Sequence, residues 1–594
     1  MKQLFIKIGI LIALLLAPSH TYAYDFEVNG IFYDVIDPAS FTCGVSGIID
    51  KDFTGNVIIP EHISYAGKDL TVTEILEDAF SEASIESISL PSTCISIGRY
   101  AFWRCSKLLT MDIPQGVTKI GSSAFKFCSS LREISLPPSL TEIGEYAFSD
   151  CESLESVNIS DLKAWCTISF EAGWCHILSD TYTSNPLSNM KAKLFLNGEL
   201  ISRLFLDESI TEINSGAFVG YAYLTGVDLN DNIQSIGRYS FWNCANLKKL
   251  RIGKGLTEIP YQAFAKCPNL AELYIVDNDA SLMFDGGISG DRYNPIATGF
   301  RAGDFRESNL KEIYIGRDLV QPKTTNAIKG YYAIFDQQDV DSVTIGPNVT
   351  LITKSYFNGD YVSGSGLLGS IKNILKLTIL PSTSPLYCMF EDIDYGEISG
   401  SPLKLVNLNT FIMGRDFAAK YKYDYVNFHR VNTYFDQCTN LDYFEIGQNV
   451  TDISYLNLDK NDNISNITVK SSIPPTCEAQ EFTKSTYLHS LLKVPNECMN
   501  LYKSAPVWKN FWNIEGCDFP SSGIKNVEYT SSSMFIISEY GSIRVINKDE
   551  GNTVRVFSIH GTKIAETRDA EIHNLPNGVY IVTVGDKSFK VFVR

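Results

Sequence analysis

Apolar residues recur along most of the chain at fixed spacings that fit neither a long helix nor a long strand. The clearest unit, residues 131–151, reads LREISLPPSLTEIGEYAFSDC. Alternation of apolar and polar residues in its first part predicts a short strand, which the prolines end. A second short extended piece turns back at Gly144. Its last part, Ala147-Phe148-x-x-Cys151, predicts one tight helical or 3₁₀ turn.

The unit repeats with a period of 23 residues, as the spacing of its phenylalanines shows: Phe102, Phe125 and Phe148, then Phe218, Phe241 and Phe264. One unit would bury about seven apolar side chains at ~1.5–3 kcal/mol each. Ordering its backbone costs ~1–2 kcal/mol per residue. Because one unit cannot fold alone, the copies must stack and cover one another. The sequence therefore predicts an α/β solenoid, a right-handed coil of short parallel strands with short helical turns.

The repeat becomes less regular after residue 276. Frame positions return around 310–315, 343–357, 377–379 and 435–453, and residues 464–469 supply a closing strand. Residues 277–306 and 383–430 do not fit the period, so we interpret them as loop insertions on one face of the solenoid.

The N-terminus predicts export. Residues 1–23 combine a basic start, an apolar run and a small-residue end, as in a secretory signal peptide, and we expect cleavage between Ala23 and Tyr24. The apolar run is shorter than the ~20 residues that a spanning helix needs. We therefore expect no membrane span after signal removal. Export through the inner membrane would leave the protein secreted or at the cell surface.

The C-terminal residues differ in style from the repeat. Three strand-like runs separated by turns, within residues 554–564, 575–582 and 589–593, predict a small antiparallel β-sandwich. The expected organisation is a signal peptide (1–23), an N-terminal β cap (24–60), leucine-rich repeats (61–276) with an insertion at about 160–200, irregular repeats with loop insertions (277–470), a C-terminal cap (471–520) and the sandwich (521–594).

The repeated frame resembles the BspA-like leucine-rich-repeat family of bacterial surface proteins. Segments 161–198 and 472–511 resemble an insertion and a C-terminal cap common in that family. The resemblance implies surface display and binding of host or microbial glycoprotein or matrix ligands, without catalytic residues or cofactors. Residues 521–594 resemble the sorting domain of the type IX secretion system, which would make them an export address. A generic β-sandwich that stays attached is the alternative.

The net charge bears on the class of partner, and the positions of the cysteines bear on disulfide bonding. The formal net charge of −18 argues against nucleic acid, which needs basic surfaces, and we expect a monomer with extracellular protein or glycan partners. Cys105, Cys128 and Cys151 share one frame position, as do Cys244 and Cys267, which favours buried thiols. Spacing alone does not exclude bridges between coils. Better disulfide candidates are the off-frame cysteines, Cys166 with Cys175, or Cys477 with Cys498 and Cys517.

The sequence gives little evidence for a catalytic or metal-binding site. His176 follows Cys175, but we interpret this insertion as structural rather than as a Cys–His pair. Asp277-Asn-Asp279 opens like a calcium loop, yet Ile288 stands where glutamate is required. We therefore expect no metal site and no catalytic residues.

Ligand contact should fall on the outward positions of the strands. We place it at Lys248, Lys249 and Arg251, together with an aromatic insertion at Tyr331 and Tyr332; a merely solvated face is the alternative. Trp103 and Trp242 are candidate aromatic anchors, although packing against the next coil explains them better.

Three functions compete. The first is an adhesin-like binding protein, the second a passive surface or biofilm scaffold, and the third a secreted hydrolase with its site in residues 277–430. We favour the first.

Overall fold

The computed structural model divides the chain into two compact units, residues 1–517 and 518–594, each with a hydrophobic core of its own. The described residues are 24–171, 184–260, 262–284, 305, 307–320, 334–335, 338–350, 371, 373–388, 405–419, 438–454, 456, 458–519, 535–539, 542–546, 553–558, 563–569, 571–572, 575, 578–585 and 587–593.

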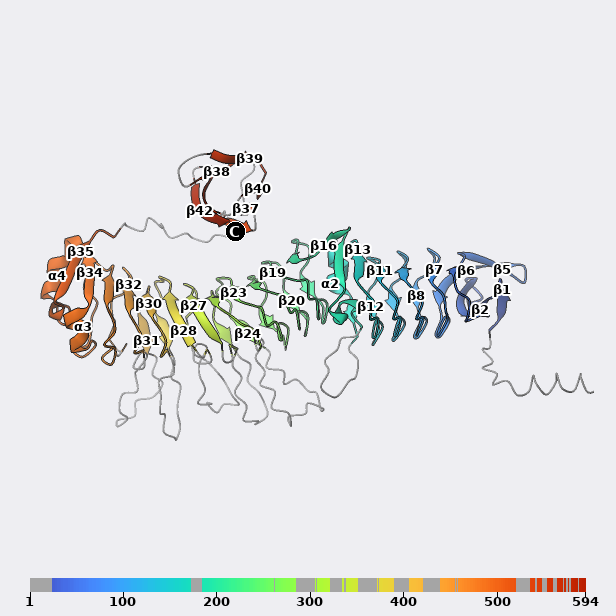
Figure 1. Ribbon diagram of the computed structural model, residues 1–594, viewed down its shortest axis with the longest axis horizontal. Helices are drawn as coiled ribbons and strands as arrows, with labels where there is room; N and C mark the ends of the chain where they lie inside the picture. Colours follow the sequence, from blue (N-terminus) through green and yellow to red (C-terminus); the bar gives the residue numbers. More distant parts are fainter. Residues whose placement is uncertain are drawn as a thin grey trace, which may run out of the picture. The chain divides into compact units, whose positions relative to one another are not determined.

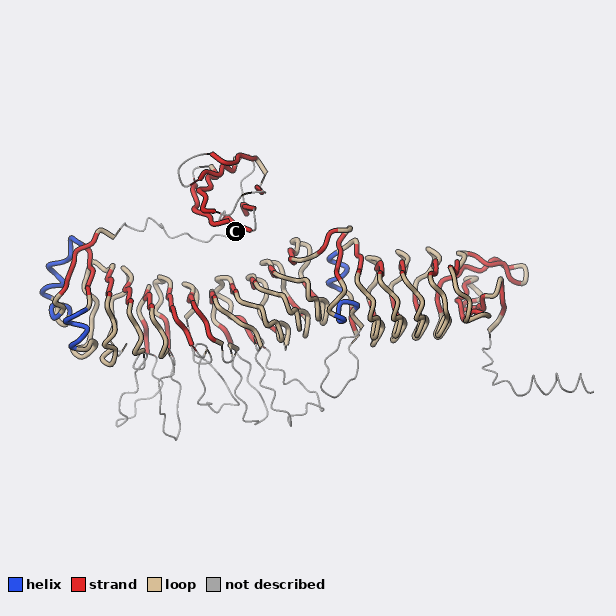
Figure 2. The backbone as a smooth tube through the Cα atoms, in the orientation of Figure 1, coloured by secondary structure: helices blue, strands red, loops and turns tan. Residues whose placement is uncertain are grey.

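The first unit is a solenoid in which most coils contribute one longer and one shorter strand (Figures 1 and 2). Its N-terminal end holds β1 (Phe26–Val28), β2 (Ile31–Asp37), β3 (Thr42–Ile48), β4 (Asn56–Ile58), β5 (His62–Tyr65) and β6 (Lys68–Ile75). Antiparallel pairing of β1, β2 and β3 gives way to parallel pairing from β3 to β6, so the solenoid begins on a small β-meander.

The longer strands form parallel ladders. β4 pairs with β7 (Ser87–Ser89). The next sheet holds β9 (Thr110–Asp112), β11 (Glu133–Leu136), β13 (Ser156–Ile159) and β15 (Lys193–Leu196), with antiparallel β16 (Glu199–Leu200) at its edge. The largest sheet, here called the long sheet, holds β17 (Arg203–Phe205), β19 (Gly226–Leu229), β21 (Lys249–Ile252), β23 (Glu272–Ile275), β25 (Glu312–Ile315), β27 (Asp339–Ile345), β28 (Asn373–Ile379), β30 (Thr410–Met413), β32 (Tyr443–Ile446), β33 (Asn466–Val469), β34 (Leu491–Pro495) and β35 (Asn513–Cys517).

The shorter strands pair in parallel too. β8 (Ser96–Ile97), β10 (Lys119–Ile120), β12 (Glu142–Ile143) and β14 (Ser169–Phe170) continue from β6. Smaller ladders are β18 (Glu212–Ile213) with β20 (Ser235–Ile236); β22 (Glu258–Ile259), β24 (Leu282–Phe284) and β26 (Leu319–Val320); and β29 (Leu386–Cys388) with β31 (Phe417–Ala419). The predicted strand-rich solenoid is confirmed.

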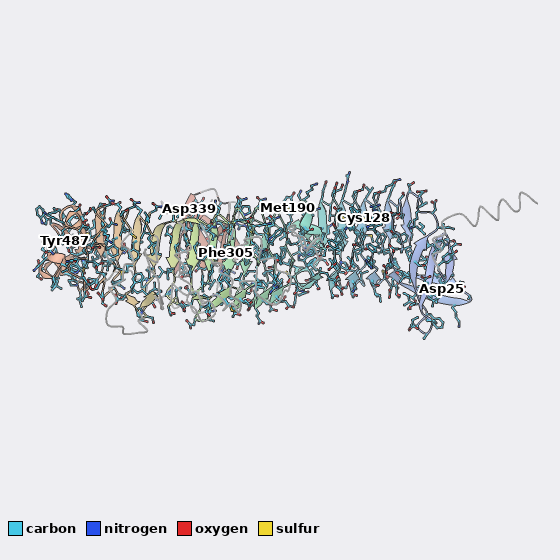
Figure 3. All side chains as sticks on the ribbon, turned by 90° about the horizontal axis from the view of Figure 1, so that it is seen from below. Asp25, Cys128, Met190, Phe305, Asp339 and Tyr487 are labelled. Carbon is cyan, nitrogen blue, oxygen red and sulfur yellow. The ribbon has the colours of Figure 1, made fainter. Side chains whose placement is uncertain are left out.

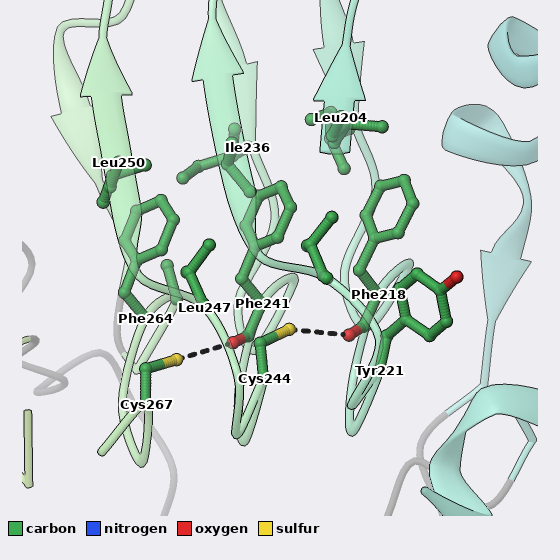
Figure 4. Close-up of a cluster of buried hydrophobic side chains, with 14 of the residues drawn as sticks. Leu204, Phe218, Tyr221, Ile236, Phe241, Cys244, Leu247, Leu250, Phe264 and Cys267 are labelled. Atoms are coloured by element: carbon green, nitrogen blue, oxygen red, sulfur yellow. Dashed lines mark hydrogen bonds between the residues drawn. The ribbon is translucent and has the colours of Figure 1, made fainter. Parts of the chain in front are cut away.

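The frame phenylalanines stack in rows through the interior. Ring centroids of Phe218, Phe241 and Phe264 are 5.3 and 5.2 Å apart, and the ring planes are within 5° of parallel (Figure 4). A second row runs from Phe80 to Phe148 with the same geometry. All of these rings are almost fully buried. Each ring therefore has its faces covered by the coils on either side rather than by its own.

The turn that carries each phenylalanine is tight, but it is not the helix that the spacing suggests. Two residues in each turn have a left-handed backbone, for example Tyr146 (φ 57°) and Asp150 (φ 62°). This conformation points alternate N–H groups along the solenoid. Phe102 N–H thus donates to the carbonyl of Ala124 in the next coil. Bonds between coils satisfy groups that a helix would satisfy within itself.

The frame cysteines are buried thiols that join coils. Cys267 Sγ lies 3.3 Å from the carbonyl oxygen of Phe241, and Cys244 Sγ lies 3.2 Å from that of Phe218 (Figure 4). The other row repeats this contact at Cys105, Cys128 and Cys151. The buried-thiol interpretation is confirmed.

The disulfide proposed for the off-frame cysteines is absent where the structure describes them. Cys477, Cys498 and Cys517 are free, and so is Cys166. Cys175 lies outside the described residues.

The insertion near residue 160 stands where a regular coil would have its phenylalanine-containing turn. Helix α2 (Leu162–Thr167) and the 3₁₀ helix η1 (Pro186–Asn189) lie between β13 and β15. Trp165 Nε1 and Asn185 Nδ2 donate to the carbonyl of Ala217 at 3.1 and 2.9 Å. In a regular coil the carbonyl of this alanine accepts a hydrogen bond from the backbone N–H of the phenylalanine one coil earlier. Here the side chains of Trp165 and Asn185 are the donors instead.

The irregular middle contains more repeat than its sequence suggests. Residues 277–306 and 383–430 are interpreted above as loop insertions, but they include β24, β29, β30 and β31. Leu408-x-x-Phe411-x-Met413 keeps the frame with phenylalanine and methionine at aliphatic positions, and all three side chains are buried. Phe305 likewise continues the aromatic row after Phe264, at 6.2 Å.

Two buried arginines brace this region. Arg317 Nη2 donates to the carbonyl of Gly253, and Arg415 Nη2 to that of Gly346, at 2.7 and 3.0 Å. Each side chain reaches past the adjacent coil to the one beyond it. Burial lowers the pKa of both guanidinium groups to about 10. Both guanidinium groups donate to backbone carbonyls, mainly in the turns that contain Gly253 and Gly346, a role that the sequence pattern did not indicate.

The solenoid ends in a helical cap on β34 and β35. The cap contains α3 (Lys484–His489), η3 (Asn496–Cys498), α4 (Met499–Ser504) and η4 (Trp508–Asn510). Trp508 is buried and its Nε1 donates to the carbonyl of Pro475 at 2.8 Å. Aromatic side chains thus close the end of the core that no further coil covers.

The second unit consists of two antiparallel sheets, as predicted for the C-terminus. One holds β36 (Phe535–Glu539), β37 (Ser542–Ile546) and β40 (Glu571–Ile572). The other holds β39 (Lys563–Thr567), β38 (Val554–Ser558), β41 (Gly578–Val584) and β42 (Lys587–Val593). Its core includes Ile543, Val556 and Val582.

Phe241→Ala should destabilise the solenoid by about 3–5 kcal/mol, because it leaves a cavity between two stacked rings. The same change at Phe127, a residue that is 37% exposed, should cost at most about 1 kcal/mol. Urea unfolding followed by circular dichroism would measure both. Equal losses would show that the buried stack is not what holds the coils.

The thiol row should make stability fall at high pH. Burial raises the pKa of Cys267 from its ordinary 9.0 to about 12. Above pH 9 the unfolded chain therefore releases a proton that the native chain keeps, and folding loses up to about 1.4 kcal/mol per pH unit until pH 12. Urea unfolding of Cys267→Ser, which cannot ionise, should depend less steeply on pH between 9 and 11. Parallel curves would contradict this.

Candidate ligand-binding face

The outward side chains of the long sheet form two rows, because its strands pair in register. Figure 3 draws the side chains along the solenoid, with exposed Asp339 and buried Phe305 labelled. The first row is Arg203, Gly226, Lys249, Glu272, Glu312, Ser342, Lys376, Thr410, Tyr443, Asn466, Leu491 and Asn513. The second row is Phe205, Asp228, Arg251, Tyr274, Tyr314, Thr344, Thr378, Ile412, Glu445, the buried Thr468, Lys493 and Glu515.

The predicted cations lie on this face, but two of them are paired. Lys249 Nζ is 2.8 Å from Glu272 Oε2 on the next strand. Arg251 contacts Asp228 at 2.9 Å and Asp231 at 3.0 Å. Lys248 is exposed beside them. Three carboxylates therefore accompany the cluster, which presents alternating charge rather than a positive patch.

Arg251 is the best-fixed side chain of this cluster. Burial opposes its charge, but Asp228 and Asp231 outweigh that effect, so the pKa of Arg251 is raised above its usual value. Its side chain is 28% exposed, half the exposure of Lys249. We conclude that Arg251 is held in one orientation before any ligand arrives.

Two tyrosines stack beside the charged cluster. The rings of Tyr274 and Tyr314 are 4.4 Å apart and within 16° of parallel. Tyr314 Oη donates to Asp277, at 2.9 Å from each carboxylate oxygen. Burial raises the pKa of Asp277, partly offset by this hydrogen bond. A Cβ at Gly346 would overlap an Asp277 carboxylate oxygen and lie 2.9 Å from the Gly316 Cα and 3.0 Å from the Tyr314 hydroxyl, so any larger residue there would displace these groups.

The row changes chemistry beyond Tyr314. Thr344 and Thr378 follow it in the second row, and Ser342 occupies the first row beside Thr344. These three side chains are partly exposed. Further along the sheet, on β32, Tyr443 donates to Glu445 at 2.8 Å, and Lys470 pairs with the same carboxylate. The outer face therefore has a charged section, a tyrosine pair and a hydroxyl section in sequence.

The tryptophans that follow the frame phenylalanines pack rather than project. Trp242 is 9% exposed and lies with Val219 and Ala265 of the neighbouring coils, which confirms the packing interpretation for this residue. Trp103 is partly buried, with the Arg104 guanidinium 4.3 Å from its ring centroid. The cation thus covers ring surface that a ligand would need.

Several predicted positions lie outside the described residues: Tyr331, Tyr332, Ala23 and the Cys175–His176 pair. Tyr24 is the first described residue and is 44% exposed. The described ranges contain no group of three or more His, Cys, Asp or Glu side chains placed to hold a metal ion. Within those ranges every helix is too short or too polar to traverse a bilayer.

Sequence inspection had not connected Tyr274, Tyr314 and Asp277. A signal exists for the charged cluster, since Asp228 and Glu272 stand 23 residues before Arg251 and after Lys249. Tyr274 and Tyr314 occupy the same frame position, but 40 residues separate them. Only the strand register shows that they are neighbours.

Comparison with known proteins identifies the repeat. A family model described as the BspA type leucine-rich-repeat region matches in six copies over residues 68–177, 188–282 and 430–540. These spans make up more than half of the chain. No curated protein matches it.

Solved structures with the same type of repeat are distant. A leucine-rich repeat protein from Bacteroides ovatus is 18% identical, covering 83% of this chain and 100% of that chain, with a TM-score of 0.34. A leucine-rich cell surface protein from Faecalibacterium prausnitzii is 15% identical, covering 84% and 95%, with a TM-score of 0.29. A T. pallidum leucine-rich repeat protein is 22% identical, covering 46% of this chain and 91% of that chain, with a TM-score of 0.23.

Arg251→Ala should destabilise the solenoid by about 1–2 kcal/mol, because it leaves two carboxylates without their charged donor. Lys249→Ala should cost at most about 1 kcal/mol, since its more exposed pair is weakened by water. Urea unfolding at low and high salt would compare them, with salt reducing the smaller effect more in proportion. A larger loss at Lys249 would contradict the assignment of Arg251 as the fixed centre.

Proposed function

The chain belongs to the BspA-type leucine-rich-repeat family, and from this premise we propose that it is an exported surface protein that binds an extracellular protein or glycan. The outer face of the long sheet is the proposed contact surface. The observation that carries the proposal is the pattern of its two outward rows. Inward positions repeat from coil to coil, whereas outward positions change from charged to aromatic to hydroxyl side chains.

Pre-ordering of these side chains favours binding over a passive scaffold. Arg251 is held by two aspartates, and Tyr314 is held by Asp277 and stacked on Tyr274. Side chains that are already fixed lose less conformational entropy when a partner binds. Tyrosine and arginine are also the residue types that dominate binding energies at protein interfaces. A scaffold without a ligand would have no use for this arrangement.

The remaining parts of the chain fit export. We propose that residues 1–23 direct the chain across the inner membrane and are removed before Tyr24. We further propose that the C-terminal β unit is a sorting domain of the type IX kind. The unit has a core of its own, including Val556 and Val582, so it could be recognised or removed separately. The ligand-binding unit would act as a monomer, without enzymatic activity.

A binding array of extracellular matrix proteins, microbial surface proteins and glycans, probed with the full chain, tests the proposal. Saturable binding to a defined protein or glycan is expected. If circular dichroism shows a folded chain and no saturable binding is found, the passive scaffold would be the better interpretation.

A variant then tests the charged cluster within the proposed face. Replacing Lys248, Lys249 and Arg251 together by Ala should weaken binding of a protein ligand from that array at least tenfold, because alternating charges fix the register of a partner. Lys119→Ala is the matched control, since Lys119 makes a similar ion pair with Glu142 at 2.7 Å on a short-strand ladder. Surface plasmon resonance would measure both. Unchanged affinity in the triple variant would exclude this cluster.

A further inference from the structure

The turns of the first repeat block carry aromatic and basic side chains on their outer side. Here the first turn face means the outer side of residues 98–107, 121–127 and 144–150. The rings of Trp103 and Phe127, from neighbouring coils, meet edge to face at 6.4 Å. The Arg104 guanidinium carbon lies 4.3 Å from the Trp103 centroid and 5.5 Å from the Phe127 centroid. Arg104 is therefore held in the corner between two rings.

Two more cations lie against rings of this face. The Arg99 guanidinium carbon lies 4.5 Å from the Tyr100 centroid, and the same side chain donates to the Tyr100 hydroxyl at 3.0 Å. Lys126 Nζ lies 5.2 Å from the Phe127 centroid. A ring face attracts a cation without neutralising its charge. The rings therefore orient three cations and leave them charged.

Carboxylates of the chain hold these cations only loosely. Arg104 Nη1 lies 3.6 Å from Glu82 Oε1, and Arg99 Nη1 lies 3.9 Å from Glu77 Oε1; all four side chains are more than half exposed. Charge-assisted N–H···O bonds are ~2.7–2.9 Å long, so neither ion pair is also a hydrogen bond. Lys126 forms no ion pair with a carboxylate that the structure describes. Exposed pairs of this kind contribute little to stability, so a partner's carboxylate could replace them at small cost.

The middle of this face is a basic section of an acidic chain. Residues 98–130 contain five Lys or Arg residues and one acidic residue, Asp112, whereas the whole chain carries a formal charge of −18. Asp112 and the cation Lys119 lie on strands β9 and β10 rather than in the turns. Carboxylates return in the turns on either side: Glu77, Asp78, Glu82, Glu145 and Asp150. Since stacked coils are ~4.8 Å apart, the basic section of two coils extends only about 10 Å along the solenoid.

This order of charges favours one class of partner. A polyanionic polysaccharide repeats its negative charge and would meet the carboxylates beyond the basic section. A protein segment can place carboxylates opposite the three cations and lysines or arginines opposite the flanking carboxylates. Guanidinium groups also bind carboxylates through two parallel N–H bonds. The charges of this face therefore complement a protein segment better than a uniform polyanion.

We infer that the first turn face docks an extracellular protein through a segment that is acidic in its middle and basic at its flanks. Arg99 and Arg104 would each donate to a carboxylate of that segment, and Lys126 would add a third positive charge. Trp103 and Phe127 would act as positioning residues, because they orient Arg104 rather than contact the partner themselves. The inference rests on the proposed function, to which it adds a second contact surface and the class of partner for it.

The test uses the full chain and two fluorescent peptides of identical composition and no net side-chain charge. In the acid-centred peptide, four glutamates lie between two pairs of lysines; in its isomer, four lysines lie between two pairs of glutamates. Fluorescence anisotropy should show at least fivefold tighter binding of the acid-centred peptide. Polygalacturonate at an equal concentration of carboxylate groups should not displace it.

Variants of the first turn face locate the binding. Arg104→Glu should weaken binding of the acid-centred peptide at least tenfold. Glu82→Gln removes the carboxylate that competes for Arg104 and should strengthen binding at least twofold. Phe127→Ala keeps every charge but removes one wall of the corner that holds Arg104, and should weaken binding at least threefold. Phe127→Tyr, which keeps a ring there, should bind as the natural chain does.

A matched control separates local contact from net charge. Lys266 lies 4.6 Å from the Trp242 centroid in a turn of the second repeat block. Lys266→Glu changes the charge of the chain as much as Arg104→Glu does, and should alter affinity no more than about twofold. Circular dichroism and urea unfolding of each variant show whether the solenoid remains intact. Glu82→Gln keeps the inference testable even if Arg104→Glu unfolds, because Glu82 is exposed.

The outcomes distinguish this inference from the proposed function. Equal affinity for the two peptides, or unchanged affinity in folded Arg104→Glu, would overturn the docking surface. Displacement of the peptide by polygalacturonate would overturn the choice of a protein partner. If either result accompanies saturable binding in the array of proteins and glycans, the surface-binding function still stands. If the chain binds neither the peptides nor any member of the array, both are overturned.

Discussion

Contact between successive coils is the interaction on which the rest of the solenoid depends. A single coil has no closed interior: the faces of its phenylalanine are covered by the rings before and after it, 5.1–5.4 Å away in the regular rows. Its turn donates backbone hydrogen bonds to the next coil, and its cysteine thiol donates to the preceding one. The stability of the solenoid therefore comes from contacts between neighbouring coils, as in other repeat proteins. These contacts constrain the identity of the inward residues and leave the outward residues free to change.

The same constraint explains the irregular parts. A coil that lacks its neighbour's turn exposes carbonyl groups, and buried carbonyls need donors. Trp165 and Asn185 supply donors where the insertion interrupts the first block. Arg317 and Arg415 supply them in the middle, and Trp508 does so in the terminal cap. At these described places side-chain N–H groups thus replace backbone donors, which lets the solenoid tolerate inserted residues without a break in its core.

This division also sets what the sequence could predict. Inward positions repeat every 23 residues, so Phe241 and Cys244 were assignable to the core from spacing alone. The left-handed turns could not be predicted from the sequence, because glycine usually marks this conformation and here residues such as Tyr146 adopt it. Contacts across strands were accessible only where the period holds, as for Arg251 and Asp228. Phe411 and Met413 escaped recognition because they replace the aliphatic residues of the frame.

The outer face is not uniformly free to vary, and this bears on its function. An outward side chain such as Lys249 makes an exposed ion pair with one neighbour and could be replaced without disturbing the core. Tyr314 differs, because its hydroxyl donates to Asp277 and both groups lie close to the Cα of Gly346, where a side chain would displace them. Gly346, just after β27, therefore leaves room for this pair of surface side chains. The core does not need this arrangement, and side chains that are already fixed are what the proposed binding function would favour, because they lose less entropy when a partner binds.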